Sequence, residues 1–279
     1  MFIIIYYLTY LLNIINAPKV ILITIDGARW QEIYQGTDPA LDQGKHLSAK
    51  ELVPNLYNYF VDQGIAIGYN TPIIASGPNH LSLPGYLEIT RGHPSYDCQN
   101  NDCSNIIIDR SILSIFDKTV VFASWLSIKK ILPKNVYSDI GPEWYRSDSL
   151  TEIKTLEYLN SHNVNFLWVA LGDTDEFAHQ NNYSLYLQAL SNADKFIGNL
   201  VRLYPQSTFI ITCDHGRSSN FKDHGLDPSS GRVWLMMRGP TVPIKGIVNN
   251  DLLSLSNIYD TVVSIKTNIL NNSIINHLH

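Results

Sequence analysis

The sequence predicts an α/β fold with a mostly parallel central sheet and helices on both of its faces. Three short runs of apolar and β-branched residues support this prediction, because such runs are typical of buried strands in parallel sheets. Polar residues follow each run, at the carboxyl edge where open α/β sheets bind their ligands. The runs are residues 20–25, 166–171 and 208–213, followed by Asp26, by Asp173 and Asp175, and by Asp214 and His215.

Segments with helical spacing of apolar residues alternate with these runs along the chain. Residues 48–63 have this spacing and end at Gly64, and Ser149 is placed to cap a helix at 150–162. Further strands are expected at 65–75, 119–123 and 232–237. The expected helices are 48–63, 83–90, 106–117, 150–162, 183–203 and 253–270, with a helix or turn at 28–34. Irregular structure is expected at 92–105, at 131–144 and in the polar segment after residue 171.

The first 17 residues are apolar and aromatic and carry no charge. This run is short for a transmembrane helix, and Ala17 ends it with a small residue, as at a signal-peptidase site. We therefore expect a signal peptide or membrane anchor at 1–17, a single α/β domain at 18–279, and an exported protein, periplasmic, extracellular or membrane-anchored. Because a basic region before the apolar run is missing, an additional strand or helix of the fold is the alternative.

Charge excludes one class of partner. The chain is 45% hydrophobic and 16% charged, with a formal net charge of -5 at pH 7. Apart from Lys129 and Lys130, basic residues do not cluster, so the sequence shows no surface for nucleic acid.

Three cysteines are present. Cys98 and Cys103 lie close together in a polar loop, where an exported protein would form a short disulfide; two free surface thiols are the alternative. Cys213 lies inside an expected strand and is interpreted as a small core residue.

Aspartate and histidine residues recur in the segments that follow the expected strands. Asp175 and His179 are four residues apart, which places both on one side of a helical turn. Asp214 and His215 follow a strand, and Asp26 and His224 add two further segments. Mixed imidazole and carboxylate ligands suit zinc or manganese better than magnesium, so these residues are candidate metal ligands.

Ser82 stands where a helix is expected to begin. Backbone N–H groups and the helix dipole favour negative charge at such a position, which suits a serine that carries a phosphoryl group. The simpler interpretation is that Ser82 only caps the helix.

Taken together, five motifs resemble those of the alkaline phosphatase superfamily, which includes nucleotide pyrophosphatase/phosphodiesterases, sulfatases and cofactor-independent phosphoglycerate mutases. The motifs are Ile25-Asp26-Gly27, Ser82-Leu83-Pro84, Asp175-x-x-x-His179, Asp214-His215-Gly216 and His224-Gly225. The resemblance implies an alkaline-phosphatase-like fold and two divalent metal ions, Zn²⁺ or alternatively Mn²⁺. It implies one ion on Asp26, Asp214 and His215, along with the nucleophile, and a second on Asp175, His179 and His224.

The resemblance also implies catalytic roles. Ser82 would be the nucleophile, and Asn101 would steady a phosphoryl oxygen, with Asn100 as the alternative. Ser76 competes with Ser82, because Ser76-Gly-Pro-Asn-His80 resembles the nucleotide pyrophosphatase motif. Gly92 lies ten residues after Ser82, as in the family, and favours Ser82.

These expectations define a reaction. The resemblance implies a metal-dependent hydrolase of phosphate monoesters or diesters that acts on a small phosphorylated substrate through a phosphoserine. A formylglycine sulfatase is not expected, because Tyr86 stands where sulfatases require arginine. The alternatives are a phosphomutase or phosphotransferase of the same superfamily and a non-catalytic metal-binding protein that keeps the fold. Cations for the third phosphate oxygen of a monoester could come from Arg29, Arg91 or Arg217, and membrane association could come from the N-terminus.

Overall fold

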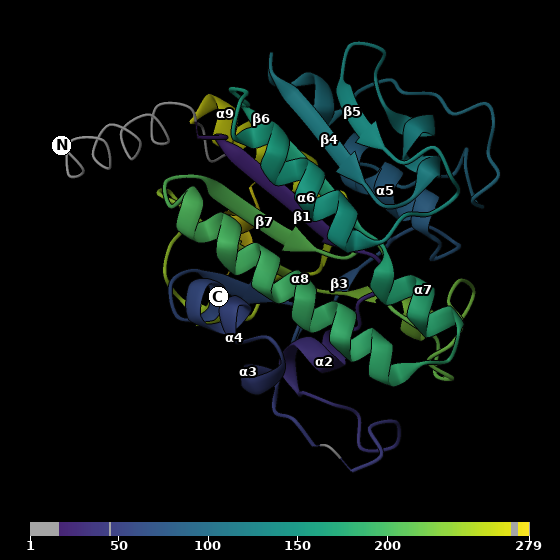
Figure 1. Ribbon diagram of the computed structural model, residues 1–279. Coiled ribbons are helices and arrows are strands. Elements are labelled where there is room, and N and C mark those ends of the chain that lie inside the picture. The colour runs from purple at the N-terminus through teal and green to yellow at the C-terminus, as the bar shows by residue number, and fades with distance from the viewer. Residues whose placement is uncertain (1–16, 45, 269–272, 279) are drawn as a thin grey trace.

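An eight-stranded sheet forms the centre of the protein, in the strand order β10-β2-β9-β7-β1-β6-β4-β5 (Figure 1). The computed structural model describes residues 17–44, 46–268 and 273–278. The strands of this sheet are β1 (Val20–Ile25), β2 (Ile65–Ile67), β4 (Thr119–Ala123), β5 (Tyr137–Ile140), β6 (Phe166–Leu171), β7 (Thr208–Thr212), β9 (Leu235–Arg238) and β10 (Gly246–Ile247). A smaller sheet contains β3 (Ile73–Ile74), β8 (Arg232–Val233) and β11 (Leu253–Ser254), in the order β11-β3-β8.

The middle of the large sheet is parallel, as the sequence predicts. All six residues of β1 are buried, and β1 pairs in parallel with β6 on one side and β7 on the other. Strands buried on both faces explain why these runs are continuously apolar rather than alternating. β9 departs from this pattern, because it pairs antiparallel with both β7 and β2. The prediction of a mostly parallel α/β sheet is confirmed.

Helices cover both faces of the sheet. Figure 1 shows α6 and α8 across the near face, with α5 and α9 behind the strands. The α-helices are α2 (Trp30–Tyr34), α3 (Ala49–Leu52), α4 (Pro54–Leu56), α5 (Ser82–Arg91), α6 (Asp148–Leu159), α7 (Asp173–His179), α8 (Tyr183–Leu203) and α9 (Asn257–Thr267). Short helices of other types are η1 (Tyr57–Val61), η2 (Ile112–Ser114), η3 (Leu126–Ile131), η4 (Pro228–Gly231) and η5 (Ile274–His277).

Several boundaries differ from the sequence prediction for local reasons. The expected helix at 48–63 is divided into α3, α4 and η1, because Pro54 disfavours helical geometry at Val53, whose φ is -129°. The expected strand at 65–75 becomes β2 and β3 in different sheets, separated at Gly68, whose φ of +103° turns the chain. Likewise, 232–237 is divided between β8 and β9, and 253–270 begins with β11 before α9.

Three elements were predicted incorrectly. The expected helix at 106–117 is absent; among these residues only η2 is helical, a single turn capped by Ser111, whose side chain accepts from the Leu113 N–H. The expected irregular region at 131–144 contains β5, an edge strand whose partly exposed residues give no continuous apolar run. The segment after residue 171, which was expected to be a polar loop, forms the helix α7 instead.

Most of the N-terminal segment that is predicted to be a signal peptide or membrane anchor lies outside the described residues. Residues 1–16 of the expected signal peptide or membrane anchor are not among the described residues, so that interpretation stays a prediction. Within the described ranges, none of the helices combines the length and the apolar character needed to span a bilayer.

A single cluster of buried apolar residues includes members of both sheets, among them Ile23, Ile73 and Leu253.

Two of the three cysteines are paired in the structure. Cys98 and Cys103 form a disulfide with a Cα–Cα distance of 5.6 Å, which confirms the first of the two alternatives. Cys213 is free and buried.

Candidate metal centre

The predicted ligands gather at the carboxyl edge of β1, β6 and β7. Asp26 directly follows β1, and its backbone N–H donates to the Leu171 carbonyl at the end of β6 (2.9 Å). α7 begins two residues after β6 and carries two of the ligands, while Asp214 and His215 follow β7. The parallel register, with Thr24 opposite Thr212, therefore brings three segments that are distant in sequence to one place.

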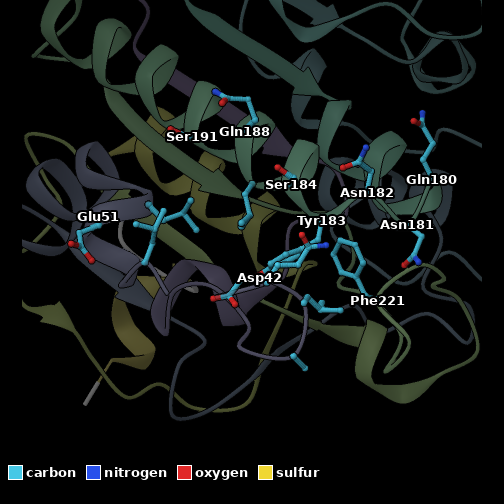
Figure 2. Close-up of a pocket in the computed structure, with 16 residues that line it drawn as sticks. Asp42, Glu51, Gln180, Asn181, Asn182, Tyr183, Ser184, Gln188, Ser191 and Phe221 are labelled. Atoms are coloured by element: carbon cyan, nitrogen blue, oxygen red, sulfur yellow. The ribbon is translucent and has the colours of Figure 1, made fainter. Parts of the chain in front are cut away.

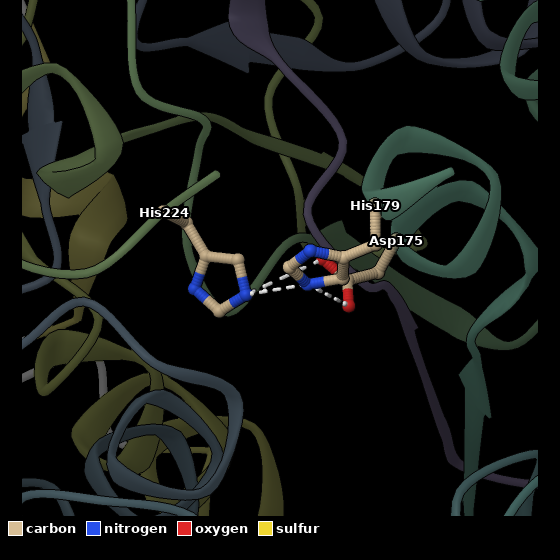
Figure 3. Close-up of side chains that lie close together, drawn as sticks. All are labelled: Asp175, His179 and His224. Carbon is tan, nitrogen blue, oxygen red and sulfur yellow. Dashed lines mark hydrogen bonds and ion pairs between the residues drawn. The ribbon is translucent and has the colours of Figure 1, made fainter. Parts of the chain in front are cut away.

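Asp175, His179 and His224 form the first group of donors. Figure 3 shows His224 facing the other two across the site. The His179 Nε2 atom lies 3.0 Å from His224 Nε2 and 3.2 Å from Asp175 Oδ2. One ligand atom from each residue lies within 4.8 Å of those of the others, a spacing that could hold a metal ion.

A second group lies deeper and shares Asp175 with the first. Ligand atoms of Asp26, Asp175 and His215 also lie within 4.8 Å of one another. The His215 Nε2 atom is 3.3 Å from Asp26 Oδ1 and 3.4 Å from Asp214 Oδ2. All six predicted ligands are thus together, although Asp175 stands between the two groups rather than belonging to one.

Two histidines present an unprotonated nitrogen to this centre. The Nδ1 atom of His215 lies 2.7 Å from the Gly216 carbonyl, and Nδ1 of His224 lies 3.0 Å from the His80 carbonyl. A carbonyl only accepts, so each Nδ1 carries the proton and each Nε2 keeps a free lone pair. Such contacts fix the tautomer and orientation that a metal ligand requires.

The electrostatics of the centre fit divalent cations. Burial lowers the pKa of His215 to about 4 and that of His224 to about 3, so both imidazoles are neutral near pH 7. Burial and the nearby Asp175 raise the pKa of Asp26 to about 7, and burial likewise raises the pKa of Asp214. The Oδ2 atom of Asp214 is buried and has no hydrogen-bond partner among the described residues. A divalent cation would neutralise these crowded carboxylates and give the unpaired Asp214 oxygen a partner.

Asp175 differs from the other two carboxylates. Burial acts to raise its pKa, but the hydrogen bond with His179 and the charge of Arg217 hold the pKa below its ordinary value. Asp175 in turn raises the pKa of His179, mainly through their hydrogen bond. Asp175 is therefore an anion ready to bind a cation.

The Ser82 hydroxyl faces the metal centre from the first residue of α5. Its Oγ atom lies 3.2 Å from His215 Nε2 and 3.5 Å from Asp26 Oδ1. The competing Ser76 hydroxyl donates instead to the Glu88 carboxylate, which also accepts from Ser256. Of the two serines, it is Ser82 whose hydroxyl lies among the predicted ligands.

Asn101 lies next to Ser82. Its Oδ1 atom accepts a hydrogen bond from the Leu83 N–H (3.0 Å), and its carbonyl accepts from Lys130 Nζ (2.9 Å). The Cys98–Cys103 disulfide closes this loop. The alternative, Asn100, uses its side-chain oxygen to accept from the Asp102 N–H within the loop.

A cavity of about 140 Å³ opens over these residues, and three aromatic side chains form one of its walls. We call Trp125, Trp144 and Tyr145 the aromatic wall. Trp144 is 59% exposed and meets Trp125 edge-on, with ring centroids 5.7 Å apart. The cavity is lined by Asp26, Ser82, Asn101, Trp125, Trp144, Tyr145, Gly172, Asp175, Glu176, His179 and His224.

A larger hollow of about 630 Å³ lies elsewhere, between residues 40–47 and the start of α8 (Figure 2). Asp42, Glu51 and Gln188 are among its polar lining residues, and the aromatic side chains of Tyr183 and Phe221 line it as well. The predicted ligands and Ser82 are not part of its lining, so its size does not make it the reaction site.

Comparison with known proteins agrees with this geometry. A family model described as the metalloenzyme superfamily matches residues 134–242. A 2-O GAG sulfatase aligns with a TM-score of 0.66 at 10% identity, covering 90% of this chain and 71% of the other. This chain has the alkaline phosphatase fold. The resemblance to that superfamily predicted from the sequence is confirmed.

Two further structures resemble this alkaline-phosphatase-like chain. A phosphonate monoester hydrolase from Silicibacter pomeroyi has a TM-score of 0.65 at 12% identity, covering 90% of this chain and 73% of the other. Murine ectonucleotide pyrophosphatase/phosphodiesterase 5, an inactive variant in complex with AMP, has a TM-score of 0.61 at 11% identity, covering 90% and 95%. A search of curated proteins finds no significant match to the sequence. The family match and the donor groups together support the binding of divalent metal ions.

The three arginines that the sequence left unplaced have different surroundings in this alkaline-phosphatase-like fold. Arg29 pairs with Glu32, and Arg91 pairs with Asp97 (2.8 Å), both away from the predicted ligands. Arg217 contacts Asp175. None of the three lines the cavity over Ser82.

Two supporting residues were not predicted. The Tyr86 hydroxyl donates to Asp26 Oδ2 (2.9 Å), and the only signal was its place one helical turn after Ser82. Asp148 accepts from the Ser124 hydroxyl (2.6 Å) and from the Gly172 and Asp173 N–H groups (2.7 and 3.0 Å). Asp148 therefore holds the turn from which α7 begins. At the start of α6 its sequence position resembles that of an ordinary first-turn acid, so it gave no signal.

Replacing Asp148 by alanine is expected to lower the free energy of unfolding by roughly 3 kcal/mol. The substitution leaves the buried N–H group of Gly172 and the partly buried N–H group of Asp173 without their acceptor. Urea unfolding measures the change. Glu157→Ala is the control on the same helix, because its ion pair with Lys154 is exposed and is expected to cost under about 1 kcal/mol. Equal losses in both variants would contradict the role of Asp148.

Proposed function

We propose that this protein hydrolyses phosphate esters at two divalent metal ions, with Ser82 as the nucleophile. One observation carries the proposal: a hydroxyl at the start of a helix lies within 3.5 Å of two of six converging metal-ligand side chains. Asp26, Asp214 and His215 would hold one ion and Asp175, His179 and His224 the other, with Asp175 close to both groups. The mixed nitrogen and oxygen donors favour zinc, with manganese as the alternative.

When bound, such ions supply positive charge that lowers the pKa of a hydroxyl and stabilises the oxygens on either side of phosphorus. The Ser82 oxygen then loses its proton to solvent and forms a bond to phosphorus. The bond between phosphorus and the ester oxygen breaks, and that oxygen leaves with the electron pair and gains a proton. Water hydrolyses the phosphoserine and restores the Ser82 hydroxyl, releasing phosphate from a monoester substrate or a phosphate monoester from a diester substrate.

Asn101 is proposed to bind a non-bridging phosphoryl oxygen. Its amide oxygen is already engaged by the Leu83 N–H, so the amide nitrogen is the group left to donate. A donor aimed where negative charge develops in the transition state is worth several kcal/mol in catalysis. The disulfide and Lys130 hold the loop that carries Asn101.

The aromatic wall supports a substrate that carries a planar ring. Trp144 lines the cavity and is largely exposed, so covering it with a planar ring would be favourable. We therefore propose aryl or nucleobase-bearing phosphate esters as the preferred class.

Trp144→Ala is expected to raise KM for an aryl phosphate by about tenfold while changing kcat little, because stacking is worth about 1–3 kcal/mol. KM for methyl phosphate, which has no ring, should stay unchanged and serves as the internal control. Trp144→Phe should keep most of the affinity. Parallel losses for both substrates would show that Trp144 supports the fold and not ring binding.

The decisive experiment compares aryl phosphate, bis-aryl phosphate and aryl sulfate on one protein sample whose zinc and manganese contents are measured. Turnover of a phosphate ester that scales with metal content supports the proposal. Tyr86 is buried and donates to Asp26, where a formylglycine sulfatase would need arginine, so aryl sulfate is expected to react slowest. Faster turnover of the sulfate ester, or phosphate ester turnover without metal, would refute it.

Two further proposals concern the localisation and the domain organisation of the protein. The Cys98–Cys103 disulfide supports an exported protein, since such bonds persist in oxidising compartments. The joint core of the two sheets supports one metallohydrolase domain over 18–279.

A further inference from the structure

The Arg217 side chain is fully buried, and each of its three nitrogens has a partner. Nε donates to the Phe221 carbonyl (2.8 Å), and Nη2 donates to the Lys222 carbonyl. Nη1 pairs with Asp175 Oδ1. A guanidinium that binds three acceptors at once has its planar fork fixed in a single orientation.

These contacts connect two segments that carry predicted metal ligands. Phe221 and Lys222 belong to the loop that leads to His224, whereas Asp175 lies on α7 together with His179. The Phe221 ring packs edge-on against Tyr183 and Tyr186 of α8, with centroids 5.1 Å apart in both cases. Arg217 therefore joins a loop that is already anchored on α8 to the carboxylate of α7.

Arg217 cannot reach a substrate directly. The residue is 2% exposed and is not part of the lining of the cavity over Ser82. Gly27 closes the remaining space, because a Cβ atom there would lie 3.0 Å from Arg217 Nη1 and 2.8 Å from Asp175 Oδ1. Any influence of Arg217 on the centre must pass through Asp175 and the loop before His224.

We propose that Arg217 is a positioning residue that sets the affinity of the metal position formed by Asp175, His179 and His224. It occupies Asp175 Oδ1 and leaves Oδ2, the oxygen 3.2 Å from His179 Nε2, to bind the ion. Partners of this kind orient carboxylate ligands, and their loss typically weakens metal binding 10–100-fold. The inference rests on the proposed ligation by Asp175, His179 and His224.

The test measures Zn²⁺ affinity by competition with a chromophoric chelator, using the full-length protein. Wild type is expected to bind two ions. Arg217→Met should weaken the position formed by Asp175, His179 and His224 by about 10–100-fold and should change the other position less, because that one keeps Asp26, Asp214 and His215. Arg217→Lys should be intermediate, because a lysine keeps the charge but offers no planar fork to three acceptors. Arg110→Met is the control: Arg110 also binds two carbonyls, those of Arg91 and Gly92, but away from the metal centre, so its affinities should match wild type.

A second readout reports on the ligand geometry itself. With Co²⁺ in place of zinc, the visible absorption band of the weakened position should change in Arg217→Met and return toward the wild-type band in Arg217→Lys. If Arg217→Met does not fold, Arg217→Lys alone carries the test.

The outcomes separate this inference from the proposed function. Unchanged affinities in the Arg217 variants, or tighter binding because Arg217 competes with the ion, would overturn the inference while the two-ion proposal stands. A wild-type protein that binds no metal would overturn the proposed function first.

Discussion

Ser82→Ala is expected to lower kcat for an aryl phosphate by at least about 10³-fold while the protein keeps its metal. The loss follows from removing the atom that bonds to phosphorus. Metal content should persist, because the six predicted ligands remain in place. Steady-state kinetics and metal analysis on the same sample measure both quantities.

Ser76→Ala is the matched control, since this serine precedes the same helix and has the family-like residues Asn79 and His80 after it. Its hydroxyl donates to Glu88, so its loss should cost some stability but less than about threefold in kcat. Full turnover in Ser82→Ala combined with inactivity in Ser76→Ala would reverse the assignment of the nucleophile.

Removing the metal is expected to abolish activity and to destabilise the protein. Binding of one ion at 1,000 times its Kd adds about 4 kcal/mol to the free energy of unfolding, and a chelator removes that contribution. Without ions, Asp26, Asp175 and Asp214 remain crowded, and Asp214 Oδ2 accepts no hydrogen bond from the residues that the structure describes. Thermal unfolding with and without chelator measures the loss, and added zinc should restore both stability and activity.

Substituting one candidate ligand at a time tests which side chains the metal and the activity depend on. His179→Ala and His224→Ala should each lose metal and activity together, because their Nε2 atoms face one another at 3.0 Å in the first donor group. His162→Ala is the control: His162 is exposed and stacks on Tyr158, so its loss should change neither quantity. An active preparation that contains no metal would refute the two-metal mechanism.

The strands and the convergence of the candidate ligands could be predicted because one physical pattern encodes both. β1, β6 and β7 are buried on both faces, so they read as apolar runs, and the first polar residues after them fall at the edge where ligands bind. Asp175 and His179 could be paired because one helical turn joins them. These relations are local in sequence.

What could not be predicted depends on contacts between distant segments. Glu88 of α5 holds the Ser76 hydroxyl, a contact that supports the preference for Ser82 but that the residue spacing does not reveal. Asp148 supports the start of α7 from a different helix, and no spacing in the sequence reveals that contact. The edge strand β5 was missed because its partly exposed residues do not form a continuous apolar run.

The pairing of Val20 with Phe166 and Thr208 has a consequence for the lifetime of the protein. The unfolded chain cannot offer the complete donor set, because these distant strands must meet before the ligands do. Bound ions would therefore stabilise the native state more than the folding transition state, and would act mainly by slowing unfolding. In a compartment rich in proteases, metal supply would then set how long each molecule survives.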